Sequence, residues 1–199
     1  ASYRATNLTR HKTRYTFDMV SPVETIAGVS LGLSGLHNVE NAVAAMAVAQ
    51  YMGITPAMIR EAMAGYRGVS RRFDYRIETD DLVYIDDYAH HPEELRACIQ
   101  SVRDIYPGKK ITGIFQPHLY SRTRDFAQEF ASVLSLLDEL IMMDIYPARE
   151  EPIEGVSSRM ILNKVTLETK ELCLASDIPA LIAERRIQVL LTMGAGDID

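Results

Sequence analysis

Four short polar runs in this chain carry the residue types that do chemistry, and each follows an apolar stretch. They occupy residues 86–92, 116–123, 144–150 and 194–197. His90, His118 and Arg122 in these runs can hold anionic groups such as carboxylates or phosphates. Asp87 can accept hydrogen bonds from a ribose diol, as acidic residues do in nucleotide-binding folds. One such run alone can simply cap the next helix, but four at one sheet edge favour a binding site.

Other chemistries fit these runs less well. A zinc site built from His90, His91 and His118 would match no common ligand spacing, and the nearby Arg122 would repel a cation, so we predict no metal site. Ser121 lacks the G-x-S-x-G elbow of a serine hydrolase. The Gly-Ala-Gly at residues 194–196 is a lone glycine turn, which is a weak signal for a phosphate loop.

Two asparagines, Asn38 and Asn41, lie three residues apart and so share one face of a predicted helix. Asparagine lowers helix propensity and is common at helix starts, so the pair can act as caps. A carboxamide also offers both a donor and an acceptor, which suits recognition of a base edge. The spacing alone leaves both interpretations open.

The elements that must position these side chains alternate between strand and helix. Strands are predicted at 82–85, 110–115, 140–145, 172–174 and 187–193, and helices at 92–106, 123–137, around Met160 and at 176–184. Strands joined by single helices indicate an α/β, Rossmann-like, mostly parallel sheet with helices on both faces. The polar runs would then meet at the carboxyl ends of the strands, where such sheets bind ligands.

The first part of the chain has a different rhythm. Residues 13–20 and 26–33 read as strands, too few for a sheet of their own, and we interpret residues 1–33 as the edge of a larger domain. Helices are predicted at 34–52, capped by Ser34 and ended by Gly53, and at 55–65, opened by Thr55 and Pro56. The rhythm changes at 68–72, so we predict units of residues 1–70 and 71–199.

Composition limits the classes of function. The 199 residues carry a net charge of −6, which argues against a protein that grips nucleic acid by its phosphates. No apolar run reaches the ~18 residues of a membrane span, and no basic-then-apolar leader opens the chain. We therefore expect no membrane partner and a cytoplasmic location. Cys98 and Cys173 have no CxxC partner and are expected to be two buried thiols in a reducing compartment.

Six motifs in order resemble one known family, the Mur ligases. They are HNVENAVAA from His37, GVSRRF from Gly68, DDYAHHP from Asp86, FQPHLYSRT from Phe115, DIYPA from Asp144 followed by PIEG, and MGAGD from Met193. The resemblance runs from about residue 34 to the end, and residues 1–33 fit the β edge of the family's central domain.

Family membership implies three domains: a UDP-sugar-binding domain, a central ATPase domain and a C-terminal Rossmann-like domain. The chain would hold the end of the second (residues 1–70, an incomplete β/α segment) and the whole third. No G-x-x-x-x-G-K-[ST] phosphate loop is present. The resemblance therefore implies a fragment, inactive alone, of an enzyme that uses ATP and Mg²⁺, with the magnesium ligands outside these 199 residues.

The reaction that the resemblance implies joins L-alanine to UDP-N-acetylmuramate through an acyl phosphate, in peptidoglycan precursor synthesis. The alternatives are the family member that recycles murein tripeptide, and a non-catalytic nucleotide-binding module. Exposed edges of a cut domain also invite self-association.

Residue by residue, the resemblance implies a nucleotide site and an amino-acid site. Asn38 and Asn41, with His37 beside them, would contact adenine. Arg72 would reach the nucleotide phosphates, and Asp87 would bind the ribose.

The amino-acid site would surround the alanine and the acyl end of the muramate. Its residues are Tyr88, His90, His118 and Arg122, and the last three would serve as the catalytic residues. Related ligases read Pro-His-Arg where this chain has Leu119, so one cationic contact to the alanine carboxylate is missing.

Overall fold

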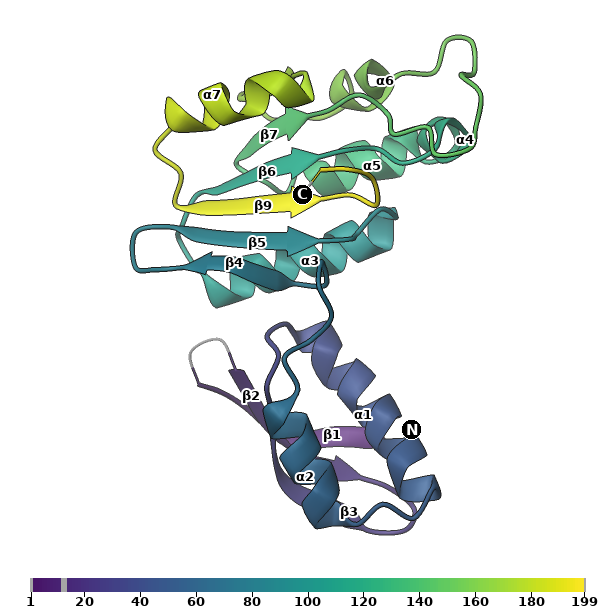
Figure 1. The fold of residues 1–199 in the computed structure, drawn as a ribbon, viewed down its shortest axis with the longest axis vertical. Coiled ribbons are helices and arrows are strands. Elements are labelled where there is room, and N and C mark those ends of the chain that lie inside the picture. Colours follow the sequence, from purple (N-terminus) through teal and green to yellow (C-terminus); the bar gives the residue numbers. More distant parts are fainter. Residues whose placement is uncertain (1, 12–13, 199) are drawn as a thin grey trace. The chain divides into compact units, whose positions relative to one another are not determined.

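The computed structural model describes residues 2–11 and 14–198 and divides into two compact units, Ala1–Val69 and Ser70–Asp199 (Figure 1). The division falls inside the stretch 68–72 where the sequence changes rhythm. Each unit has its own core. No helix within the described ranges is long and apolar enough to cross a membrane.

The N-terminal unit is a three-stranded antiparallel sheet packed against two helices. Its strands β1 (Arg4–His11), β2 (Arg14–Val20) and β3 (Thr25–Leu31) pair in the order β1-β2-β3. Helices α1 (Leu36–Tyr51) and α2 (Pro56–Gly65) complete the unit. Alternate residues of β2 and β3 are buried, among them Phe17, Met19 and Ile26. They pack against apolar residues of the helices, among them Val39, Met46 and Ile59. The prediction that these strands cannot form a sheet of their own was therefore wrong.

One carboxylate in β2 holds a bulge in each neighbouring strand. The pairing with β1 shifts between Thr6 and Thr9, and the pairing with β3 shifts opposite Asp18. Asp18 accepts a hydrogen bond from Asn7 Nδ2 at 2.7 Å and another from the Gly28 N–H at 2.7 Å. Asn7 and Gly28 both have positive φ, at 52° and 66°, the conformation common at bulges.

The two helices of this unit begin differently. Thr55 accepts a hydrogen bond from the Met58 N–H and Pro56 follows it, as predicted for α2. Helix α1 begins instead after Gly35, with no side-chain cap, so the cap predicted at Ser34 was wrong. Ser34 is buried and supplies a carbonyl to the Asn38 side chain.

The C-terminal unit is a six-stranded sheet in the order β4-β5-β9-β6-β7-β8. Five strands are parallel, namely β5 (Val83–Asp87), β6 (Ile111–Phe115), β7 (Glu139–Met142), β8 (Lys170–Leu172) and β9 (Val189–Met193). At one edge β4 (Asp74–Glu78) runs antiparallel to β5. The Rossmann-like α/β prediction is confirmed.

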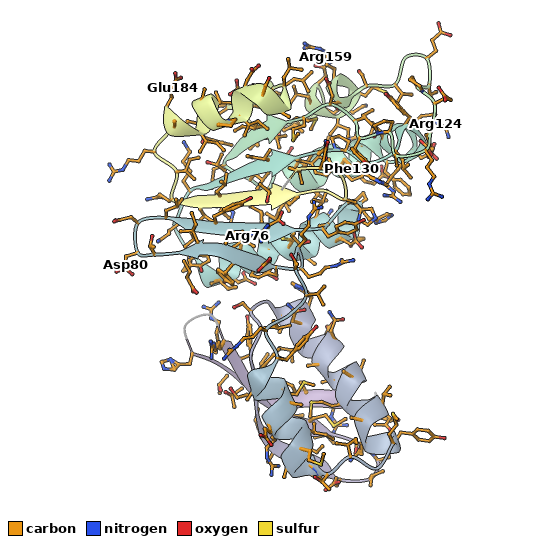
Figure 2. The ribbon with its side chains drawn as sticks, in the orientation of Figure 1. Arg76, Asp80, Arg124, Phe130, Arg159 and Glu184 are labelled. Carbon is orange, nitrogen blue, oxygen red and sulfur yellow. The ribbon has the colours of Figure 1, made fainter. Side chains whose placement is uncertain are left out.

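Helices cover both faces of this sheet (Figure 1). One face packs on α3 (Pro92–Ile105), α5 (Ala127–Leu134) and α6 (Ser158–Leu162), with Phe130 pointing from α5 into the core (Figure 2). The other face packs on α7 (Ile178–Ala183). Neighbouring strand residues alternate between the two layers, as Ile114 and Phe115 do on β6.

Four details of this unit differ from the sequence predictions. Strand β4 was missed, because three of its five residues are charged and none of the five is buried. The helix predicted at 123–137 is divided at Phe126 into α4 (Tyr120–Asp125) and α5, where the Phe126 ring packs edge-on against His91 at 5.0 Å. A short 3-10 turn (Ala175–Asp177) precedes α7, without a cap from Ser176. Cys98 is buried as predicted, but Cys173 is only partly buried.

Candidate functional site

The four polar runs lie at the carboxyl end of the parallel strands of the C-terminal sheet. Backbone hydrogen bonds join the loops that leave these strands: Gly194 N–H to Asp87 O at 3.1 Å, Gln116 N–H to Met193 O at 3.1 Å, and Tyr146 N–H to Pro117 O at 2.8 Å. The loops after β5, β9, β6 and β7 are therefore neighbours. This edge of the sheet is where open α/β folds place their ligands.

Aromatic rings from three of these loops form a continuous row. Tyr88 and His90 meet edge-to-face with centroids 5.3 Å apart, and the His90 and His118 rings meet at 5.8 Å. His118 stacks on Tyr146 at 5.8 Å, with 17° between the ring planes. The structure thus brings together three predicted site residues, Tyr88, His90 and His118, and adds Tyr146, which the sequence analysis did not single out.

His118 and Arg122 each carry a buried polar atom without a partner. His118 Nδ1 and Arg122 Nη1 are buried and make no hydrogen bond to any described residue. Burial lowers the pKa of His118, and the positive charge of Arg122 lowers it further, so the ring is neutral at pH 7. Because an unpaired buried donor is costly, the Arg122 guanidinium is suited to bind an anionic ligand.

Glu150, after β7, fixes the helix that carries Arg122. Its carboxylate accepts the Ser121 N–H at 2.9 Å and the Ser121 hydroxyl at the start of α4. These hydrogen bonds lower the pKa of Glu150, so the carboxylate is charged at neutral pH. Sequence reasoning placed Glu150 in a polar run but gave it no role, because its partner lies 29 residues away.

Leu119 opens α4 with a left-handed backbone, φ 73°. Its N–H donates to Tyr146 O at 3.0 Å and its carbonyl accepts the Thr123 hydroxyl at 2.9 Å. These contacts hold the loop between His118 and Arg122 in place. They come from the backbone, so they do not depend on which side chain stands at position 119.

Asp87 is almost fully buried and already accepts hydrogen bonds from the protein backbone. It is 6% exposed, and its two oxygens accept the N–H groups of Phe73 at 2.7 Å and Ala89 at 2.8 Å. Burial raises the pKa of Asp87 to about 6 in spite of these hydrogen bonds and the nearby Arg72 charge. Each oxygen keeps a second acceptor position, so a ribose would share the carboxylate with the two amides.

Two adjacent arginines differ sharply in their surroundings. Arg72 is exposed and its guanidinium lies over the Tyr88 ring at 5.2 Å. Arg71 turns inward and donates to Gly196 O at 2.9 Å and to Gly194 O at 2.8 Å. Its Nε lies 3.4 Å from the fully buried Asp86. The sequence analysis assigned a role to Arg72 and missed Arg71, whose partners lie more than 100 residues away.

The glycine turn after β9 is packed too tightly to admit a side chain. A Cβ at Gly196 would stand 2.2 Å from Gln116 Oε1 and 2.7 Å from the Tyr146 ring. Gln116 in turn donates from Nε2 to Asp197 at 2.8 Å. The turn is therefore a fixed wall of the site, clamped by Arg71 from one side and by Gln116 from the other.

The asparagine pair belongs to the N-terminal unit. Asn38 Nδ2 donates to Ser34 O at 2.7 Å, and Asn41 Nδ2 lies 3.4 Å from Asn38 Oδ1. Neither caps α1, because Gly35 holds the cap position, so the capping interpretation was wrong. Asn41 is exposed and its Oδ1 is not engaged by any described group. Burial lowers the pKa of the neighbouring His37.

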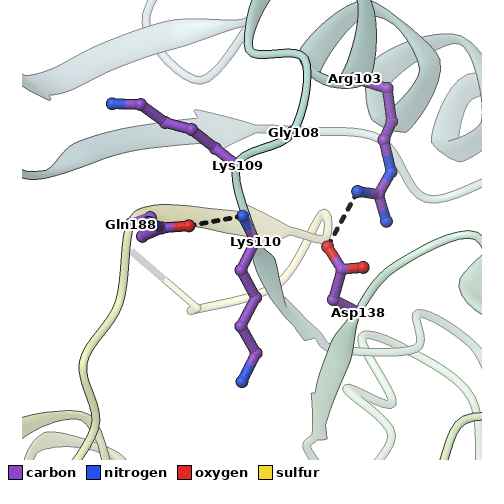
Figure 3. A pocket seen from close by; sticks show the side chains of 6 residues that line it. All are labelled: Arg103, Gly108, Lys109, Lys110, Asp138 and Gln188. Carbon is purple, nitrogen blue, oxygen red and sulfur yellow. Dashed lines mark hydrogen bonds and ion pairs between the residues drawn. The ribbon is translucent and has the colours of Figure 1, made fainter.

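A cavity of about 400 Å³ lies at the opposite, amino end of the strands (Figure 3). Its cations are already neutralised or bonded. Arg103 contacts Asp138 at 2.8 Å, Lys110 contacts Glu139 at 2.6 Å, and Lys109 donates to Asp80 O at 3.0 Å. It contains none of the predicted site residues.

No cluster of three or more His, Cys, Asp or Glu side chains in the described part of the chain is arranged to hold a metal ion. We assign no magnesium-dependent step to the described residues.

Comparison with known proteins places the chain in a family. A family model described as Mur ligase, glutamate ligase domain, matches residues 71–196. The chain is 53% identical over 199 residues to the UDP-N-acetylmuramate–L-alanine ligase of Parabacteroides distasonis. This match covers 100% of this chain and 43% of that relative. Identity to the enzyme of the same name from Flavobacterium johnsoniae is 46% over 198 residues, covering 100% and 44%.

Solved structures of ligases share the fold of this chain. The UDP-N-acetylmuramate–alanine ligase of Thermotoga maritima superposes with a TM-score of 0.81 at 27% identity, over 99% of this chain and 43% of that one. A murein peptide ligase from Psychrobacter arcticus shares the fold, with a TM-score of 0.65 at 21% identity over 98% of this chain and 42% of that one. The chain thus spans less than half the length of these relatives. Since the family model matches most of the chain and the relatives match nearly all of it, the chain belongs to the Mur ligase family.

Proposed function

We propose that this chain is the C-terminal portion of an ATP-dependent ligase that joins L-alanine to UDP-N-acetylmuramate in the cytoplasm. In this proposal residues 1–70 complete the central ATP-binding domain, and residues 71–199 are the ligase domain. The observation that carries the proposal is the buried, unpartnered Arg122 Nη1 beside the neutral His118. A guanidinium with a free donor is the group that binds a small carboxylate such as that of alanine.

The chemistry assigned to the chain's own residues is mainly positioning. ATP supplies the phosphoryl group that activates the muramate carboxylate. Asn38 and Asn41 would hold the adenine, Asp87 the ribose, and Arg72 the phosphates. Holding the amine next to the activated carboxyl makes the attack effectively unimolecular, which lowers the barrier.

The amino-acid site handles both charges of alanine. Arg122 binds its carboxylate, while Tyr88, His90 and His118 enclose the amine and the acyl end of the muramate. Donors aimed at this point stabilise the negative charge of the tetrahedral intermediate before phosphate leaves.

Substitution of Arg122 tests this assignment in a protein of the relatives' length that contains this chain. Arg122→Ala should raise KM for L-alanine roughly 10- to 100-fold, because a hydrogen bond to a charged group is lost in a closed site. Arg124→Ala is the matched control, since Arg124 lies on the same helix, is half exposed and pairs with Asp125 at 2.7 Å. It should leave KM unchanged.

Three outcomes would contradict the proposal. Equal effects of the two substitutions would remove Arg122 from the site. Phosphate release that depends on murein tripeptide and not on alanine would favour the recycling ligase. ATP binding without any substrate-dependent phosphate release would favour a non-catalytic nucleotide-binding module. The 199-residue chain alone should release no phosphate, since it carries no phosphate loop.

A further inference from the structure

The His90 ring is held from one side only. Its Nδ1 lies 2.9 Å from the Tyr88 carbonyl oxygen and 3.3 Å from Glu94 Oε2. No described group makes a hydrogen bond to Nε2, at the opposite edge of the ring. The ring therefore has one fixed edge and one edge available to a ligand.

Glu94 is itself anchored at the start of α3. Its Oε2 accepts the backbone N–H of His90 at 3.0 Å and that of His91 at 3.2 Å. Burial tends to raise the pKa of Glu94, but these hydrogen bonds and the His90 ring outweigh it and lower the pKa. A charged carboxylate is thus fixed beside Nδ1 by the same helix start that positions His90.

The partners of Nδ1 determine where the imidazole proton sits. A carbonyl oxygen and an ionised carboxylate can only accept hydrogen bonds, so Nδ1 must donate. In the neutral ring Nε2 then carries no hydrogen, and its lone pair can accept a hydrogen bond. In water a neutral histidine side chain prefers the opposite form, with the hydrogen on Nε2, so the observed surroundings select the less common tautomer.

The groups around His90 leave its Nε2 lone pair available as a hydrogen-bond acceptor for a ligand. His118 faces the ring at 5.8 Å, Arg122 lies on the helix that follows His118, and the Arg72 charge acts on Glu94. His118 is neutral, and the arginines can only donate hydrogen bonds. An amino acid brings a carboxylate, which suits Arg122, and an amine, which needs an acceptor.

We propose that Glu94 is a positioning residue that holds His90 in its Nδ1–H form, so that Nε2 accepts a hydrogen bond from the amino group of the incoming amino acid. The identity of that ligand rests on the proposed function. The tautomer of His90 does not, because it follows from contacts within the C-terminal unit.

The tautomer can be measured directly on this chain by NMR with ¹⁵N-labelled histidine. The chain has only five histidines, and loss of one signal set in His90→Gln assigns the ring. At mildly alkaline pH, where imidazoles are neutral, wild-type His90 should show a protonated Nδ1 and an unprotonated Nε2. Finding the hydrogen on Nε2 in the wild type would overturn the proposal without any variant.

Three substitutions separate the charge of Glu94 from its capping role. Glu94→Ala should raise the fraction of the Nε2–H form, because only the Tyr88 carbonyl then accepts from Nδ1. Glu94→Gln should keep Nδ1–H, because its amide oxygen can still accept. Glu93→Ala is the matched control, since Glu93 lies in the same first turn but is exposed and contacts Arg96 at 3.7 Å. An unchanged tautomer in a folded Glu94→Ala variant would refute the positioning role.

Kinetics in the longer protein tests the ligand. Glu94→Ala should raise KM for L-alanine roughly three- to tenfold, the value of one hydrogen bond, and leave KM for ATP unchanged. A parallel rise of both constants would mean a structural role and would refute the proposal. If no ligase activity is found in the wild type, the proposed function fails while the NMR result still decides the tautomer.

Discussion

Replacement of Arg71 and Arg72 one at a time should separate an internal clamp from a solvent-facing cation. Arg71→Ala removes two hydrogen bonds to the carbonyls of Gly194 and Gly196 and leaves the fully buried Asp86 without its ion pair. Breaking a buried pair by removing one partner costs about 3–5 kcal/mol, so we expect a loss of that size in the unfolding free energy of the C-terminal unit. Arg72→Ala removes an exposed contact with the Tyr88 ring, worth about 0.5–1 kcal/mol.

The assay must report on the C-terminal unit alone, because the chain has two compact units. Hydrogen exchange of the amides in β5 and β9, followed in increasing urea, meets this need, since both strands lie inside that sheet. With a slope of about 2 kcal/mol per molar urea, Arg71→Ala should lower the midpoint by roughly 2 M.

Arg71→Lys should lie between the two alanine variants, because one ammonium group cannot reach both carbonyls and the carboxylate as a guanidinium does. The reasoning would be refuted if Arg71→Ala changed the unfolding free energy by less than about 1 kcal/mol, or if Arg72→Ala cost as much.

Three further predictions concern the site's supports. Because the pKa of Asp87 is raised to about 6 from an unfolded value of about 3.9, its stabilising contribution is complete below about pH 4. It is lost as pH rises through about 6, by about 3 kcal/mol. The difference in unfolding free energy between wild type and Asp87→Asn should therefore fall between these values, and a flat difference would contradict the raised pKa. Gly196→Ala should displace Gln116 and lower Tm by several degrees, whereas an unchanged Tm would show that the turn has room. Leu119→Asn should raise the unfolding free energy by about 1 kcal/mol, since asparagine tolerates a positive φ better, and denaturant unfolding will show whether it does.

The part of the fold that follows from local pattern could be read from the sequence. Apolar runs such as those around Phe115 and Leu191 predicted the parallel strands, and the polar residues after them predicted the ligand edge. Strand β4 escaped because an edge strand with mostly polar residues has no such pattern. The break at Phe126 escaped because the apolar pattern continues through it, and the ring of Phe126 contacts His91, 35 residues earlier in the chain.

The candidate site was predictable by residue type but not by role. His90, His118 and Tyr88 do lie together at the carboxyl end of the sheet, after β5 and β6, which flank β9. The structural roles of Arg71 and Glu150 depend on partners that only the fold supplies. Asp87 illustrates the limit, because the sequence shows a carboxylate at a strand end but not the two amides that it already serves.

The carboxylate of Asp18 has a consequence for how this family can vary in length. Each bulge inserts one extra residue opposite β2, and deleting that residue from β1 or β3 would restore regular pairing, leave the following side chains on their own face and remove a hydrogen bond to Asp18. Both extra residues are tied to the same aspartate, so neither outer strand can shorten without disturbing the hydrogen bonding of the other. Insertions and deletions among relatives should therefore avoid residues 6–9 and 26–29 and gather in the turns between the strands, and substitutions at Asn7, Asp18 and Gly28 should occur together.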